Sequence, residues 1–126
     1  MRKNISTNTP GEERVGYSRA VIINGKVYIT GTTSVNETGK TIGSTVYEQT
    51  KYCIEKIQSV LENENFSLKD IVVIRAFLVS MKGISEFDKA FKEYFYDIKP
   101  TCTLVGTNAL VKPDLLIEIE CIAEKA

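Results

Sequence analysis

Lys99-Pro100-Thr101-Cys102-Thr103-Leu104-Val105-Gly106 and Leu116-Ile117-Glu118-Ile119-Glu120-Cys121-Ile122-Ala123 close the chain and decide its fold. Successive side chains of a strand point to opposite faces of a sheet, so the second stretch predicts a strand with Ile117, Ile119 and Cys121 on one face. Glu118 and Glu120 then share the other face. Two carboxylates in a strand rich in Ile and Leu indicate that this face is wet or that it holds a carboxylate in a pocket.

Periodicity elsewhere predicts the remaining elements. Asn24-Gly25 is a strong signal for a two-residue hairpin. Residues 1–13 are expected to form a flexible arm, or a turn at Pro10-Gly11. One predicted helix has a buried stripe at helical spacing, and a later one has an aromatic face. These residues are Cys53, Ile57, Val60 and Leu61 in the first, and Phe87, Phe91, Tyr94 and Phe95 in the second. Asp88 falls in the first turn of the later helix, with Ser85 as its N-cap. The expected strands are 20–23, 27–30, 71–80, 101–106 and 115–123, and the expected helices are 46–62 and 86–96. This order predicts an α+β fold, one mainly antiparallel sheet with two helices on one face.

Length and composition limit the possible functions. The 126 residues fit a single domain, 1–126, and 16 basic residues balance 16 acidic ones, so neither nucleic acid nor a membrane is an expected partner. No apolar run reaches the roughly 18 residues that span a bilayer, and the first residues lack a signal-peptide pattern. The three cysteines are far apart in the sequence, which is typical of reduced thiols rather than of a disulfide framework. We therefore expect a cytoplasmic protein. Without histidine, His-based catalysis and His-ligated metals are excluded, and neither a metal nor a cofactor is expected.

The stretch from Ile71 to Ser80 is largely apolar on both of its predicted faces. Strand alternation places Ile71, Val73, Arg75, Phe77 and Val79 on one face, and Val72, Ile74, Ala76, Leu78 and Ser80 on the other. Two helices cover only one face of a sheet, so the other face must meet another surface. Self-association is the simplest way to cover it.

Three motifs together resemble the Rid (YjgF-like) reactive-intermediate deaminases, nearly along the whole chain. The first two motifs are Val15-Gly16-Tyr17-Ser18-Arg19-Ala20-Val21 and Val27-Tyr28-Ile29-Thr30-Gly31-Thr32. The third is Pro100-x-x-x-x-Val105-Gly106, followed by Leu116-Ile117-Glu118-Ile119-Glu120. The resemblance implies a chorismate-mutase-like fold and a homotrimer with small-molecule clefts between subunits. It also implies hydrolysis of enamines or imines, such as 2-aminoacrylate, to a keto acid and ammonia.

The resemblance also assigns roles to single residues. Glu118 corresponds to the glutamate that activates water, and Tyr17, Thr30, Gly31 and Asp88 correspond to pocket positions. Glu120 shares the face of Glu118, and two nearby carboxylates raise each other's pKa. Each residue also has a plain structural reading: Glu118 as a solvated edge carboxylate, Tyr17 as a packing aromatic, Thr30-Gly31 as a strand end, and Asp88 as a helix-start residue.

One position departs from the family pattern. Cys102 stands where deaminating members have the arginine that clamps the substrate carboxylate, and a thiol cannot replace that bidentate pair. Arg19, two residues from Tyr17 on an expected strand, is a candidate replacement; the alternative is a solvated surface arginine. Cys102 itself is expected to be a buried, inert thiol rather than a nucleophile. The resemblance therefore implies a trimer that binds a small carboxylated, imine or enamine metabolite and hydrolyses it through Glu118. The alternative is a non-catalytic metabolite-binding or chaperone-like trimer. Ribonuclease activity is disfavoured because the chain has no histidine and no net positive charge.

Overall fold

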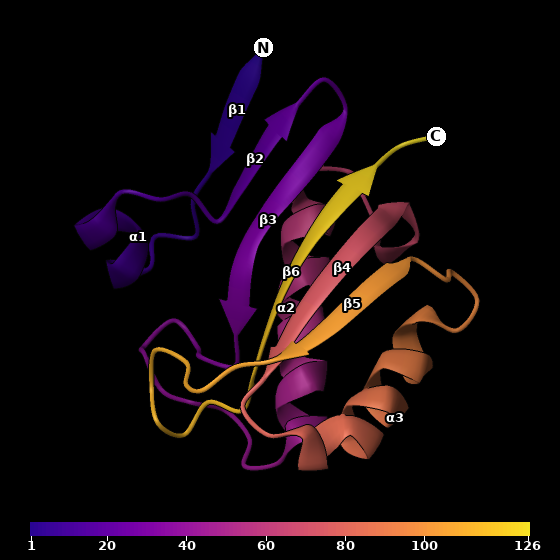
Figure 1. The fold of residues 1–126 in the computed structure, drawn as a ribbon. Coiled ribbons are helices and arrows are strands. Elements are labelled where there is room, and N and C mark those ends of the chain that lie inside the picture. The colour runs from indigo at the N-terminus through magenta and orange to yellow at the C-terminus, as the bar shows by residue number, and fades with distance from the viewer.

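The computed structural model describes residues 1–126 and arranges six strands in one sheet (Figure 1). Only β4 and β5 run parallel; the other neighbours are antiparallel. The α+β class and the mainly antiparallel sheet are therefore confirmed. The strands, in their spatial order, are β1 (Arg2–Ile5), β2 (Ala20–Ile23), β3 (Lys26–Thr33), β6 (Ile117–Glu124), β4 (Ile71–Leu78) and β5 (Thr101–Gly106).

Two long helices, α2 (Val46–Asn63) and α3 (Ile84–Phe95), cover one face of the sheet and leave the other open (Figure 1). The helix α2 starts at a capping box, in which the Thr45 side chain accepts from the Glu48 amide and Glu48 bonds back. The predicted stripe of α2 is buried, and so are two of the predicted aromatic residues of α3. These residues are Cys53, Ile57, Val60 and Leu61 of α2, and Phe87 and Phe95 of α3.

The alternation of β6 is as predicted: Ile117, Ile119 and Cys121 are buried under the helices, and Glu118 and Glu120 face the open side. On β4 the predicted alternation is wrong at one end. A register irregularity between Ile71 and Val73 moves Ile71 to the helix face, where it joins Ile74. The open face still carries the partly exposed Val73 and Phe77 of β4.

The N-terminal residues, expected to form a flexible arm, contain two regular elements. Strand β1 pairs with β2, and the short helix α1 (Pro10–Val15) ends at Gly16, which has a φ of 94°. Two short 3-10 helices, η1 (Leu68–Asp70) and η2 (Met81–Gly83), precede β4 and α3.

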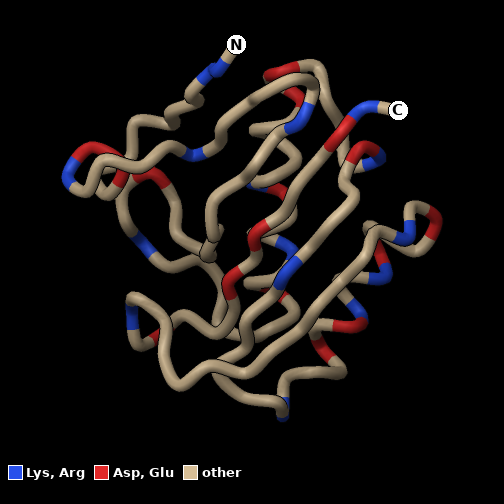
Figure 2. The backbone as a smooth tube through the Cα atoms, turned by 45° about the horizontal axis from the view of Figure 1, so that its top comes forward, with Lys and Arg blue, Asp and Glu red and all other residues tan.

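The start of α3 also corrects two predictions. Because η2 leads directly into α3 at Ile84, Ser85 lies inside the helix and is not its N-cap, and Asp88 lies beyond the first turn. Acidic and basic residues are spread over the whole chain, and residues 113–124, which include β6, carry acidic residues only (Figure 2). None of the helices combines the length and hydrophobicity needed to cross a membrane.

Candidate functional site

The carboxylate of Glu118 lies directly against the backbone of Gly31. In the pairing of β3 with β6, Ile29 lies opposite Cys121 and Thr32 opposite Ile119, so the register slips across the intervening two residues. A β-carbon at position 31 would overlap the Glu118 carboxylate. Glycine at this position therefore makes the space in which the carboxylate sits, and two of the predicted site residues are brought together.

The surroundings of Glu118 favour its protonated form. Partial burial raises the pKa of the Glu118 carboxyl above its ordinary value of 4.5, the Glu120 carboxylate raises it further, and the Arg19 guanidinium opposes them. Glu120 in turn lies 3.6 Å from the guanidinium of Arg75 on β4. A carboxylate with a raised pKa beside an open sheet face is a stronger base than a free carboxylate, and it can take a proton from water and return it.

Arg75 was missed as a site residue, although it is the one charged residue in the apolar run of β4. That isolated charge in a strand was the available signal. The register that places Arg75 opposite Glu120 depends on the pairing of β4 with β6.

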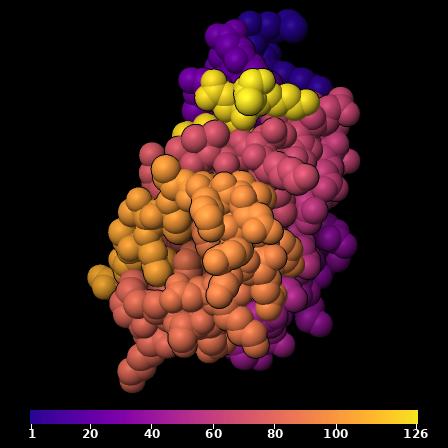
Figure 3. Space-filling model, turned by 90° about the vertical axis from the view of Figure 1, so that its right-hand side faces the viewer, coloured from indigo at the N-terminus to yellow at the C-terminus, as the bar shows by residue number.

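Cys102 lies on the opposite face of the sheet from Glu118. It pairs with Ile74 in the parallel β4–β5 ladder, and Ile74 is buried beneath the helices, whereas Glu118 pairs with Phe77 of the open face. Cys102 is exposed on the edge strand β5, so its expected burial is wrong. Figure 3 shows the side of the molecule that α3 and β5 form. Partial burial raises the pKa of its thiol, and the Asp88 carboxylate adds to this, so the group is a neutral thiol.

The expected common strand face for Tyr17 and Arg19 is wrong. Strand β2 begins only at Ala20, and the left-handed Gly16 turns the chain before Tyr17. Tyr17 is 42% exposed and its hydroxyl approaches Gly11 of α1, whereas Arg19 is only 8% exposed. The alternative of a solvated surface arginine is therefore also wrong.

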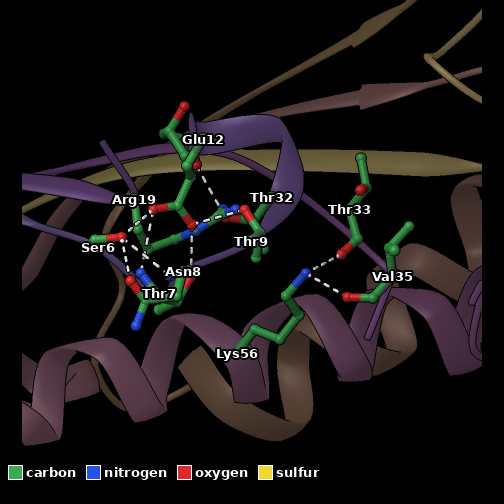
Figure 4. Close-up of polar contacts among 11 residues, drawn as sticks. Ser6, Thr7, Asn8, Thr9, Glu12, Arg19, Thr32, Thr33, Val35 and Lys56 are labelled. Carbon is green, nitrogen blue, oxygen red and sulfur yellow. Dashed lines mark hydrogen bonds and ion pairs between the residues drawn. The ribbon is translucent and has the colours of Figure 1, made fainter. Parts of the chain in front are cut away.

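Glu12 is the ion-pair partner of Arg19, and the sequence reading missed it. The Glu12 Oε2 atom lies 3.8 Å from Arg19 Nε, and the carboxylate accepts hydrogen bonds from Ser6, Thr7 and Thr9 (Figure 4). Burial raises the pKa of Glu12, but these bonds outweigh it, so the pKa lies below 4.5. A run of hydroxyl residues just before an acidic residue was the available signal.

Thr30 contributes backbone rather than side-chain contacts. Its amide donates to the Arg19 carbonyl, and its carbonyl accepts from the Thr32 hydroxyl. No group of three or more histidine, cysteine, aspartate or glutamate side chains is arranged to hold a metal ion. Within one chain, the predicted site thus divides into Glu118, Glu120 and Gly31 on the open face and Cys102 with Asp88 on the other.

Comparisons with known proteins agree over nearly the whole chain. The family model described as Endoribonuclease L-PSP matches residues 8–125. A RutC family protein of Pyrococcus abyssi is 32% identical over 99% of both chains, and the mitochondrial protein mmf1 of Schizosaccharomyces pombe is 37% identical over 92% of this chain and 73% of its own. The crystal structure of Rv2704 from Mycobacterium tuberculosis, a member of the YjgF/YER057c/UK114 family, has a TM-score of 0.91 at 30% identity, covering 99% of this chain and 100% of its own. The chain therefore belongs to the Endoribonuclease L-PSP family, the YjgF-like or Rid proteins.

Proposed function

We propose that this protein hydrolyses a small imine or enamine to a carbonyl compound and ammonia, with Glu118 as the group that activates water. The observation that carries the proposal is the Glu118 carboxylate, half-buried against Gly31 with a raised pKa. A carboxylate held in this way is suited to general acid–base catalysis.

The reaction needs only water and this carboxyl group. The imine reacts in its protonated form. Glu118 takes a proton from water as the oxygen bonds to the imine carbon, and the electron pair of the C=N bond moves to the nitrogen, which gives a neutral carbinolamine. The protonated Glu118 then returns its proton to the nitrogen, the C–N bond breaks and ammonia leaves, while the carbinolamine hydroxyl gives its proton back to the Glu118 carboxylate as the carbonyl forms. An enamine enters the same sequence after protonation on carbon.

We further propose that the reacting cleft lies between subunits of a homotrimer. In support, Glu118 and Cys102 occupy opposite faces of one sheet, so a cleft that includes both positions needs two chains. Gly31, Thr30 and Tyr17 would line it from one subunit, and Cys102 and Asp88 from the next. We place the reaction in the cytoplasm, although two relatives are mitochondrial proteins.

Cys102 bears on the choice of substrate. Because a neutral thiol stands where the family's clamp arginine would bind a carboxylate, we expect 2-aminoacrylate to be a poor substrate. The same feature favours the second candidate, a trimer that binds metabolites without turnover. Ribonuclease activity, which the family description names, ranks below both, because the chain has no histidine and no net positive charge.

The test is ammonia release from 2-imino acids of varied side chain, generated in place by an amino-acid oxidase. Wild type should accelerate hydrolysis, and Glu118→Gln should lower kcat/KM about a hundredfold or more. Because the pKa of Glu118 is raised, activity should fall as pH drops through a value above 4.5.

The matched control is Glu124→Gln, an exposed glutamate at the end of the same strand, which should keep full activity. If wild type binds imino acids but accelerates none of them, the non-catalytic reading replaces this one. Equal rates for wild type and Glu118→Gln would remove Glu118 from the mechanism.

A further inference from the structure

We propose that the protein has a second anion site, separate from Glu118, in which Arg19 and Lys56 bind a small carboxylate with a short apolar body. The site is a cleft of about 230 Å³ between the N-terminal loop, residues 6–9, and helix α2. Neither Glu118 nor Tyr17 nor Cys102 lines it. Figure 4 shows Arg19 and the N-terminal loop above α2, with Lys56 rising from the helix beside them.

Arg19 is a buried cation whose hydrogen-bonding capacity is largely unused. Its side chain is 9% exposed, and its one hydrogen bond is a long one, 3.4 Å from Nη1 to the Thr32 hydroxyl. The Glu12 carboxylate, at 3.8 Å, lies beyond hydrogen-bond distance and already accepts from the N-terminal loop. A guanidinium has five N–H donors in a planar fork, so most of them have no protein acceptor here.

Lys56 adds a second positive charge to the same cleft. Its ammonium donates to the carbonyls of Thr33 at 2.8 Å and Val35 at 2.7 Å, which leaves a third donor. It forms no ion pair; the carboxylate of Glu37, also on the cleft, is exposed. Burial lowers the pKa of Lys56, and the charge of Arg19 lowers it further. An anion between the two groups would offset the burial of the ammonium and its repulsion by the guanidinium.

The walls of the cleft decide the class of anion. The fork of Arg19 matches the two oxygens of a carboxylate, and Ile29, Val35, Ile57 and Val60 offer an apolar surface. The cleft is smaller than the roughly 300–1,000 Å³ typical of drug-sized ligands. A carboxylate with a tail of a few carbons fits these features better than inorganic phosphate does.

Binding is measured by titration calorimetry at pH 7 and constant ionic strength, with acetate, butanoate, hexanoate and inorganic phosphate as probes. We expect butanoate to bind more tightly than acetate and phosphate, and to shift the amide NMR signals of residues 7–9 and 56–60. Phosphate binding more tightly than butanoate and hexanoate, or shifts confined to β6 and Gly31, would overturn the proposal.

Substitutions locate the site. Lys56→Met removes the charge and keeps most of the stem, and it should weaken butanoate binding about ten- to a hundredfold, as the loss of a charge-assisted hydrogen bond does. Lys56→Arg should restore most of the affinity. Arg19→Lys keeps the charge but loses the fork, and it should also weaken binding.

Two controls keep the test decisive. Lys51→Met, on the same helix but paired with Glu93, should leave the affinity unchanged. Glu118→Gln should also bind butanoate normally, so this site and the proposed hydrolytic site can fail independently. Folding of Lys56→Met is judged by an unchanged circular dichroism spectrum, and equal affinity of this folded variant and wild type would refute the site. If Arg19→Lys does not fold, the comparison of Lys56→Met with Lys56→Arg decides alone.

Discussion

The position of the Glu118 carboxylate depends on the lack of a side chain at residue 31. The carboxylate fills the volume that a β-carbon would need, and the backbone of Gly31 does not have the positive φ that would itself require glycine. The contact is with the far end of a flexible side chain, which can rotate away. At the scale of the residue, Gly31 thus serves the placement of Glu118 more than the stability of the fold.

We therefore expect Gly31→Ala to abolish most of the proposed activity while it lowers the free energy of unfolding by less than about 1 kcal/mol. Urea denaturation and the imine assay measure the two effects. Gly25→Ala is the converse control, because its φ of 78° strains an alanine and destabilises the protein while the activity remains. An active Gly31→Ala enzyme would show that Glu118 need not lie where the structure places it.

At the scale of elements, one carboxylate fixes the N-terminal loop. Glu12 is 4% exposed and accepts hydrogen bonds from the Thr7 amide and from the hydroxyls of Ser6, Thr7 and Thr9. These bonds hold the segment between β1 and α1 against Arg19. The loop that borders the proposed carboxylate cleft is therefore ordered by a buried acid rather than by an apolar contact.

Glu12→Gln should lower the free energy of unfolding at pH 7 by about 1–3 kcal/mol, because an amide cannot accept all of these bonds. The folded-state pKa of Glu12 is below 4.5, so the stabilisation by its charge is present above pH 4.5 and is lost as pH falls through the folded value. The difference between variant and wild type should shrink accordingly. Glu13→Gln, at the neighbouring exposed position, is the control; equal hydrogen exchange of the Thr7 amide in wild type and Glu12→Gln would contradict the role.

For the whole molecule, the open face of the sheet is the feature that remains without a covering layer. Tyr28, Val72 and Val105 are each more than 40% exposed, and the half-buried Val73 and Phe77 lie among them. Apolar area of this kind on a sheet is a common site of association between copies. It supports the proposed trimer, and it would place the Glu118 side of one chain against its neighbours.

Light scattering at micromolar concentration should give three times the chain mass of 14.1 kDa. Val73→Asp should shift the mass toward the monomer, because assembly would bury an unpaired carboxylate. Val111→Asp, at a loop position that is 83% exposed, should remain trimeric. A monomer mass for wild type would remove both the trimer and the cleft between subunits.

Much of the fold could be predicted from local patterns. The alternation of β6, the buried stripe of α2 and the Asn24-Gly25 hairpin each appear as expected, with φ values of 50° and 78° in the turn. Each of these features depends on residues only a few positions apart. A period of 2 or 3.6 identifies the buried side of an element because that side must lose its contact with water.

The sequence by itself thus determined the types of the main strands and helices, most of their buried faces, and the family resemblance that singled out Glu118 and Gly31. Only the tertiary structure decided that Arg19 pairs with Glu12, that Arg75 meets Glu120, and that Cys102 and Glu118 lie on opposite faces. These outcomes follow from strand order, from register slips in β3 and β4, and from the left-handed turn at Gly16. Such features are set by packing between distant segments, for which local periodicity carries no signal.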